Sequence, residues 1–120
     1  MLKLHFLTGL GMLCALTAQA ADEAAIQRGR EVYTVNQCYA CHGTLGQGGE
    51  RGAGPRIAPN PFPSAAFEAQ MRKPRAVMPR YTVSDIDEQK IKDLYAFVAS
   101  IPASPPVASI PLLRDAMRQP

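Results

Sequence analysis

The chain has 120 residues, 47% of them hydrophobic, with 13 lysines and arginines, 10 aspartates and glutamates, and a formal net charge of +3. This length suits one small domain, whose modest core commonly needs a covalent link or a bound cofactor as reinforcement. The charge balance is mild and aromatic residues do not alternate with the basic ones, which excludes a typical nucleic-acid-binding surface.

Residues 1–20 have the pattern of a secretory signal peptide. Lys3 is basic, residues 6–16 form a short apolar stretch, and residues 18–20 (Ala-Gln-Ala) resemble a cleavage site. A membrane-spanning helix needs about 20 apolar residues, and the bulky leucine before Cys14 disfavours a lipid-attachment site. We therefore expect cleavage after residue 20, no transmembrane segment in the mature protein, and a location in the periplasm.

A helix is predicted over residues 22–39, at the start of a domain that we assign to residues 21–102. Asp22 and Glu23 lie where a helix start favours negative charge. Small and apolar residues then recur at three- and four-residue steps, at Ala25, Ile26, Gly29, Val32 and Tyr33. This helix would bring Cys38 to its end.

Residues 43–63 are predicted to form a loop. They hold four prolines and all but one of the glycines that follow residue 20, so neither a helix nor a central strand can persist there. A structureless loop of about 20 residues is uncommon in a small domain unless it has a function. A phosphate-binding loop at residues 46–49 is disfavoured because no Gly-Lys-Ser/Thr ending follows it. We expect the loop to wrap around a large apolar group.

Two more helices are predicted, and no stretch alternates with a period of two, so the chain is expected to be all-α. Ser64 can cap a short helix that runs to about Arg72, where Lys73-Pro74 stops it. Asp85 and Glu88 have the spacing of a capping box. The helix that they begin carries one apolar stripe, made of Ile91, Leu94, Tyr95, Val98 and Ile101.

Residues 103–120 form the third predicted segment, a tail with four prolines. We expect this tail to be extended rather than helical. Ile110, Leu112 and Leu113 are available as anchors, either to a partner protein or to the surface of the domain itself.

The stretch Cys38-Tyr39-Ala40-Cys41-His42 has three possible functions. A structural zinc site needs four ligands, and beyond residue 20 these are the only cysteines and histidine. A redox dithiol favours the N-terminus of a helix, whereas this pair is expected at the far end of one. A disulfide across so short a loop would stabilise little. Cys-x-x-Cys-His is also the signature of c-type haem attachment.

Haem attachment gives each residue of the motif a role. Cys38 and Cys41 would form thioethers to one haem c, and His42 would be an axial ligand of its iron. The candidates for the other axial position are Met71, Met78, Met117, a lysine, or nothing. Met78 is favoured because it precedes Pro79 in a predicted loop, whereas a methionine within a helix commonly fills the core.

The chain resembles class I c-type cytochromes over residues 25–101. Gly29 and Tyr33 resemble the family's Gly-x-x-x-aromatic pattern on the first helix. Gly54-Pro55 resembles the Gly-Pro of that family, and Met78-Pro79 resembles its distal Met-Pro turn.

This resemblance implies a fold and a ligand set. Three main helices would wrap around one covalently bound haem, with the first helix crossing the last near Leu94 and Phe97. The carbonyl of Pro55 would accept the ring proton of His42, and Met78 would be the distal ligand.

Other residues are expected to line the haem pocket. We assign Pro55, Arg56, Ile57, Arg80 and Tyr81 to it, with the arginines and the tyrosine as candidates for the haem propionates, although each arginine also suits a solvated surface. Four residues should bury the haem and raise its potential: Ile57, Phe62, Phe67 and Val77. A basic cluster without any acid surrounds Met78 and would steer an acidic partner; it comprises Arg72, Lys73, Arg75 and Arg80.

The expected activity is single-electron transfer through an exposed haem edge, by a carrier rather than an enzyme. Residues 71–81 (MRKPRAVMPRY) are similar to cytochrome subunits of periplasmic dehydrogenases, including flavocytochromes of the cresol-hydroxylase kind. This similarity implies a flavin-, quinone- or molybdenum-dependent dehydrogenase as donor, together with a downstream electron acceptor. The alternatives are a diffusible shuttle to a terminal oxidase or reductase, and a sensor or enzyme with five-coordinate haem.

Overall fold

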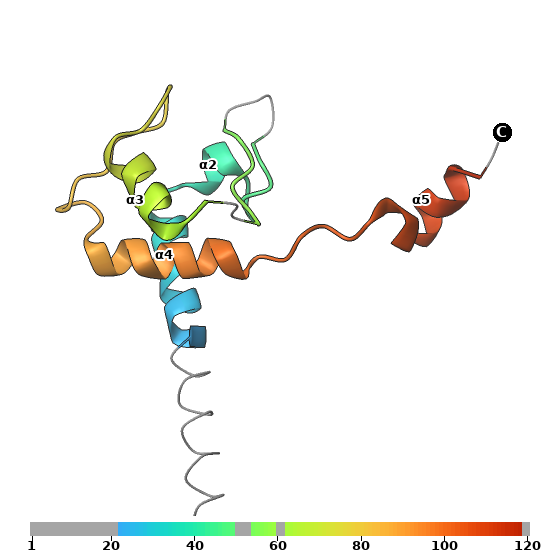
Figure 1. The fold of residues 1–120 in the computed structure, drawn as a ribbon, viewed down its shortest axis with the longest axis horizontal. Coiled ribbons are helices and arrows are strands. Elements are labelled where there is room, and N and C mark those ends of the chain that lie inside the picture. Colours follow the sequence, from blue (N-terminus) through green and yellow to red (C-terminus); the bar gives the residue numbers. More distant parts are fainter. Residues whose placement is uncertain (1–21, 50–53, 60–61, 119–120) are drawn as a thin grey trace, which may run out of the picture.

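The computed structural model describes residues 22–49, 54–59 and 62–118, and over these residues it contains helices and no strand. This confirms the all-α prediction. A helical stretch at residues 22–35 comes first. It is followed by α2 (Tyr39–His42), α3 (Ser64–Arg72), α4 (Glu88–Ser100), the 3-10 turn η2 (Val107–Ser109) and α5 (Pro111–Ala116) (Figure 1).

The predicted signal peptide lies outside the described residues, as does Cys14. Among the residues that the structure describes, no helix is both long and apolar enough to cross a membrane.

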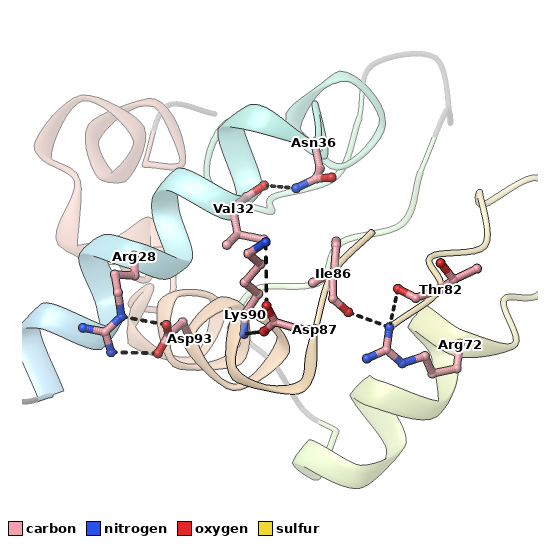
Figure 2. Close-up of polar contacts among 9 residues, drawn as sticks. All are labelled: Arg28, Val32, Asn36, Arg72, Thr82, Ile86, Asp87, Lys90 and Asp93. Carbon is pink, nitrogen blue, oxygen red and sulfur yellow. Dashed lines mark hydrogen bonds and ion pairs between the residues drawn. The ribbon is translucent and has the colours of Figure 1, made fainter. Parts of the chain in front are cut away.

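The helical stretch 22–35 crosses α4 at very close range (Figure 1). A Cβ atom on Gly29 would collide with the backbone carbonyl of Asp93 and with Phe97. The rings of Tyr33 and Phe97 pack with their centroids 5.4 Å apart. Arg28 adds a two-pronged ion pair, with Nε 2.7 Å and Nη2 3.0 Å from the carboxylate oxygens of Asp93 (Figure 2). Glycine therefore lets the two helices meet where the resemblance implied that they would.

The first helical stretch ends earlier than predicted, in a Schellman motif. The Cys38 amide donates to the Tyr33 carbonyl and the Gln37 amide donates to the Thr34 carbonyl, each at 3.1 Å. Gln37 has the left-handed φ of 55° that this motif requires. The helix predicted to residue 39 thus stops at residue 35. Cys38 is instead the N-cap residue of α2.

The helices α3 and α4 lie where they were predicted, but other residues begin them. Ser64 was expected to cap α3, yet it is the first helical residue and Pro63 occupies the N-cap position. Asp85 was expected to begin the capping box of α4. The actual N-cap is Asp87, whose carboxylate accepts from the Lys90 amide at 2.8 Å. Asp85 instead closes a turn by accepting from the amide and hydroxyl of Thr82.

The core lies between the first helical stretch, α3 and α4. Its most deeply buried side chains are Ile86, Leu94 and Val98. From the predicted stripe of α4, Tyr95 and Ile101 are only half-buried. The ring of Tyr95 packs edge-on against Phe67 of α3 at 5.5 Å between centroids, and Met71 is buried from the same helix. This core fixes the two ends of the loop between α3 and α4.

The tail is extended over residues 102–106 but not throughout, since η2 and α5 follow. Pro111 occupies the first turn of α5, a position that proline tolerates well in a helix. In Figure 1, α5 lies beyond the end of α4 and apart from α2 and α3. Leu112 is 79% exposed and Leu113 is 42% exposed, so neither covers the domain.

Candidate functional site

His42 is the last residue of α2, and its ring is oriented by the loop that follows. Nδ1 of His42 lies 2.9 Å from the carbonyl oxygen of Pro55. A carbonyl can only accept, so Nδ1 carries the proton and donates it. In the neutral imidazole, this tautomer leaves a lone pair on Nε2, which is the form that binds a metal.

Gly54 makes this contact sterically possible. A Cβ atom at Gly54 would lie 2.6 Å from the Cys41 carbonyl oxygen and 3.1 Å from Nδ1 of His42. Any side chain there would push the loop away from α2, and the Pro55 carbonyl with it. The resemblance implied this contact, and its steric basis is the absence of a side chain at Gly54.

The loop after His42 folds back on itself next to the imidazole. The Gly48 amide donates to the His42 carbonyl at 2.8 Å, and the Ile57 amide donates to the Gly46 carbonyl at 2.8 Å. Gly46 has a φ of 62° and is buried against Ile57 and Ala58. Within its described part, the glycine-rich loop therefore has a defined shape and supports His42.

The thiols of Cys38 and Cys41 lie on the same face of the turn that leads to His42. The amides of Cys41 and His42 both donate to the Cys38 carbonyl, at 3.3 and 2.9 Å, and residues three apart on such a turn are neighbours. Both cysteines carry free thiols. Burial raises the pKa of the Cys38 thiol to about 11.

This pKa bears on the redox-dithiol alternative. The sequence placed the cysteine pair at the far end of a helix, whereas the structure places Cys38 at the N-cap of α2, a position that commonly lowers a thiol pKa. Because burial dominates and the pKa is raised instead, Cys38 stays protonated at neutral pH. A reactive dithiol needs a thiolate, so the environment of Cys38 disfavours that function.

Two tyrosines lie next to the thiols. Burial, followed by the nearby Cys38, raises the pKa of Tyr33 to about 12. The pKa of Tyr81 is also raised, first by burial and then by the proximity of Cys38 and Cys41. Tyr81 follows Met78 by three residues, so the end of the methionine-bearing loop faces the cysteine pair.

Met78 lies on the loop of residues 73–80, the first part of the connection between α3 and α4. Its side chain is half-buried and packs against the core. Ala76 has the unfavourable left-handed φ of 56° in the turn just before it. The amide Nε2 of Gln70, on the last turn of α3, lies 3.6 Å from the Met78 sulfur.

This loop is closed at its base. The Tyr81 amide donates to the Met71 carbonyl at 3.1 Å. Arg72 Nη1 donates to the carbonyls of Ile86 at 2.7 Å, Thr82 at 2.9 Å and Tyr81 at 3.3 Å, and Figure 2 draws the first two of these bonds. Arg72, which the sequence placed in a solvated basic cluster, thus holds together the two ends of the loop.

The other methionine candidates are placed less favourably. Met71 is only 4% exposed and belongs to the core. Met117 is 62% exposed and lies in the tail beyond α5. Among these three methionines, Met78 alone combines partial burial with a position on a loop.

The remaining predicted pocket residues lie in different environments. Ile57 and Phe67 pack against the core as partly buried side chains, and Tyr81 is half-buried. Pro55, Arg56 and Arg80 are exposed. Two residues expected to bury a haem are also exposed in the protein, Phe62 at 58% and Val77 at 88%.

The donor set fits a haem. It offers two thiols one turn apart, an imidazole with a free Nε2, and a half-buried thioether, which are the groups that hold a c-type haem and its iron. No cluster of three or more Cys, His, Asp or Glu side chains suited to a bare metal ion occurs within the described ranges.

Three residues make contacts that could not be predicted from the sequence. Gln70 is an unremarkable polar residue on a short amphipathic helix, and only the fold of the loop brings it to the Met78 sulfur. Arg72 was predicted as part of the basic cluster, but its bonds to three carbonyls at the base of the loop were not predicted. Asp93 lies within the apolar stripe of α4, where its partner 65 residues away leaves no signal in the local pattern.

Comparisons with known proteins identify the family. A search of curated proteins and a search of solved structures each found no match to this chain. A family model described as cytochrome c oxidase, cbb3-type, subunit III matches residues 24–98, a range that includes the cysteine pair, His42 and Met78. The chain therefore belongs to this family of c-type cytochrome domains, with the all-α fold, the haem binding and the electron-transfer function of a cytochrome c.

Proposed function

We propose that this protein is a periplasmic, monohaem c-type cytochrome that carries single electrons. In this proposal Cys38 and Cys41 form the thioether links, His42 is the proximal iron ligand, and Met78 is the distal one. The observation that carries the proposal is the pair of oriented ligands: an imidazole fixed through Pro55 and a thioether on a loop closed at its base.

The chain's residues set the properties of this site. When bound, haem supplies an iron that gains and loses one electron, and joint histidine and methionine ligation raises its potential. With His42 and Met78 both engaged, no ligand position remains for a substrate. This supports a carrier rather than an enzyme, and it disfavours a five-coordinate sensor.

The optical spectrum of the purified, oxidised holoprotein tests the ligand set. The weak absorption band near the red edge that reports iron-methionine bonding is expected in the wild type and in Met117→Ala. It is also expected in Met71→Leu, which preserves the volume of the core. Met78→Ala should lose the band, because the thioether is removed while the haem stays covalently attached. A band that persists in Met78→Ala would refute the assignment of Met78.

We further propose that electrons enter or leave across the surface around Val77. Val77 is 88% exposed one residue from Met78, and Lys73, Arg75 and Arg80 are exposed around it. An apolar contact inside a positive rim suits a partner with an acidic docking surface. Arg72 does not belong to this rim, because its guanidinium is bonded to backbone carbonyls.

Small redox reagents can measure the effect of this rim without a natural partner. Oxidation of the reduced holoprotein by hexacyanoferrate(III), an anion, should slow with rising salt. At low salt it should slow about tenfold in the double variant Arg75→Glu/Arg80→Glu, because steering by local charge is lost or reversed. Arg118→Glu, which reverses the charge of one exposed residue in the tail, is the control and should slow the reaction by much less than half of the effect of the double variant on the logarithm of the rate. If a cationic cobalt complex showed the same dependence, steering by the rim would be disproved.

The natural redox partner has two candidates, one an electron donor and the other an electron acceptor. The similarity of residues 71–81 to dehydrogenase cytochrome subunits favours a flavin-, quinone- or molybdenum-dependent dehydrogenase. The family description, cytochrome c oxidase subunit III, favours electron delivery toward a terminal oxidase. Substrate-dependent reduction of the holoprotein by a soluble periplasmic fraction would support the first, and cyanide-sensitive oxidation by membranes would support the second.

A further inference from the structure

The contact between Gln70 and Met78 joins two segments whose relative position is fixed. Gln70 lies on the last turn of α3, and its Nε2 is 3.6 Å from the sulfur of Met78, a normal length for a hydrogen bond to sulfur. Both side chains are partly buried. The Tyr81–Met71 backbone bond and the Arg72 guanidinium close the loop that carries Met78. The sulfur is therefore held against the amide by the backbone.

A thioether sulfur has two lone pairs and is a weak acceptor. If one lone pair accepts the Gln70 N–H, only the other remains for a metal. We propose that Gln70 is a positioning residue that selects which lone pair of Met78 faces the haem iron. This inference rests on the proposed role of Met78 as the distal ligand.

The same hydrogen bond has an electronic consequence. It draws electron density from the sulfur, which weakens the thioether as a donor. A ferric iron depends on that donation more than a ferrous iron does, so the bond favours the reduced state and raises the potential.

Gln70 also borders a hollow on the protein surface. This hollow has a volume of about 420 Å³, and its other lining residues are Ala66, Ala69, Arg72, Lys73 and Arg75. Shortening this side chain would let water approach the sulfur, which is a steric effect distinct from the loss of a hydrogen bond. A test must separate the two effects.

Two variants and a control make this separation. Gln70→Leu removes the donor but keeps the bulk, and Gln70→Ala removes both. Gln27→Leu is the control, because the Gln27 amide makes an exposed hydrogen bond to Glu23 at 2.7 Å. The measurements are the midpoint potential of each holoprotein and the iron-methionine absorption band.

We expect Gln70→Leu to keep the absorption band but to lower the preference for the reduced state about threefold, as suits one weak hydrogen bond. For a one-electron couple this is a fall of about 30 mV. Gln70→Ala should fall at least as far, and Gln27→Leu should match the wild type.

If Gln70→Leu has the wild-type potential, Gln70 is only a filler or a shield and the inference fails, whatever Gln70→Ala does. Retention of the band in Met78→Ala would instead remove the proposed ligand itself. The two failures are therefore distinguishable.

Discussion

At the scale of single residues, the site depends on one position that has no side chain. Gly54 lets the Pro55 carbonyl approach His42 because nothing fills the space toward the Cys41 carbonyl and the imidazole. The orientation of His42, the proposed proximal ligand, thus depends on a residue that has no side chain with which to bond it.

Gly54→Ala should lose the bond between Nδ1 of His42 and Pro55. The added Cβ would overlap the Cys41 backbone at 2.6 Å, so we expect a loss of about 2 kcal/mol in the free energy of unfolding. The midpoint potential should rise, because an imidazole that no longer donates to a carbonyl is a poorer donor to ferric iron. Denaturant titration and potentiometry of the holoprotein measure both.

Thr44→Ala, an exposed change in the same loop, is the matched control for Gly54→Ala and should alter neither quantity. An unchanged potential in Gly54→Ala would show that the Pro55 carbonyl still reaches the histidine.

At the scale of elements, the ion pair between Arg28 and Asp93 ties the first helical stretch to α4 (Figure 2). Asp93 is 3% exposed, and the hydrogen bonds from Arg28 and Gln89 hold the pKa of its carboxyl below the usual value despite the opposing effect of burial. A depressed carboxyl pKa stabilises the folded state above the unfolded pKa of about 3.9. That stabilisation is lost as the pH falls through the lower, folded value.

The pH dependence of unfolding tests this ion pair. Between about pH 5 and pH 3 the wild-type holoprotein should lose stability more steeply than Asp93→Asn, whose side chain does not titrate. Equal slopes for the two proteins would contradict the role of Asp93.

Arg28→Leu should cause a modest loss in the free energy of unfolding at neutral pH, because it leaves a buried carboxylate with only one side-chain donor. This is less than for a fully buried pair, since the Arg28 side chain is 53% exposed. Lys90→Ala removes an ion pair exposed on both sides and should cost under about 0.5 kcal/mol.

The helices were predictable from the sequence, whereas several of their ends were not. Amphipathic spacing located α3 and α4, because a helix that buries one face has apolar residues at three- and four-residue steps in its sequence. The end of the first helical stretch was missed because Gln37, not the usual glycine, adopts the left-handed conformation there. Asp85 and Asp87 have equal capping chemistry, and only the turn closed by Thr82 decides between them.

The candidate site follows the same division. The contact between His42 and Pro55 was implied by the resemblance of Gly54-Pro55 to the Gly-Pro of class I cytochromes, and the structure has this contact. The contacts of Gln70 with the Met78 sulfur and of Arg72 with three carbonyls depend on how one loop returns to its helix. The local sequence pattern does not indicate how the loop folds back onto α3, so these contacts are known only from the structure.

At the scale of the whole molecule, the tail is separate from the domain that carries the site. The family match ends at residue 98, and α5 lies apart from α2 and α3 in Figure 1. The exposed side chains of Val107, Leu112 and Met117 show that this segment buries little apolar surface within the chain.

Deletion of residues 103–120 should leave the spectrum and the midpoint potential of the holoprotein unchanged, and should alter its free energy of unfolding by less than about 1 kcal/mol. Absorption spectra and denaturant titration of the shortened and full chains check this. A lost iron-methionine band would show that the tail supports the haem site. Unchanged spectra with weaker capture by the electron donor would assign the tail to docking.

The closed base of the Met78 loop separates two kinds of change. Because the Tyr81–Met71 bond and the Arg72 guanidinium fix the ends of the loop, the exposed residues Lys73, Arg75 and Val77 are free to vary in charge and size while the sulfur stays in place. Partner choice and redox potential can therefore change independently among related chains. Partner recognition depends on the exposed residues of the loop, whereas the redox potential depends on the position of the Met78 sulfur.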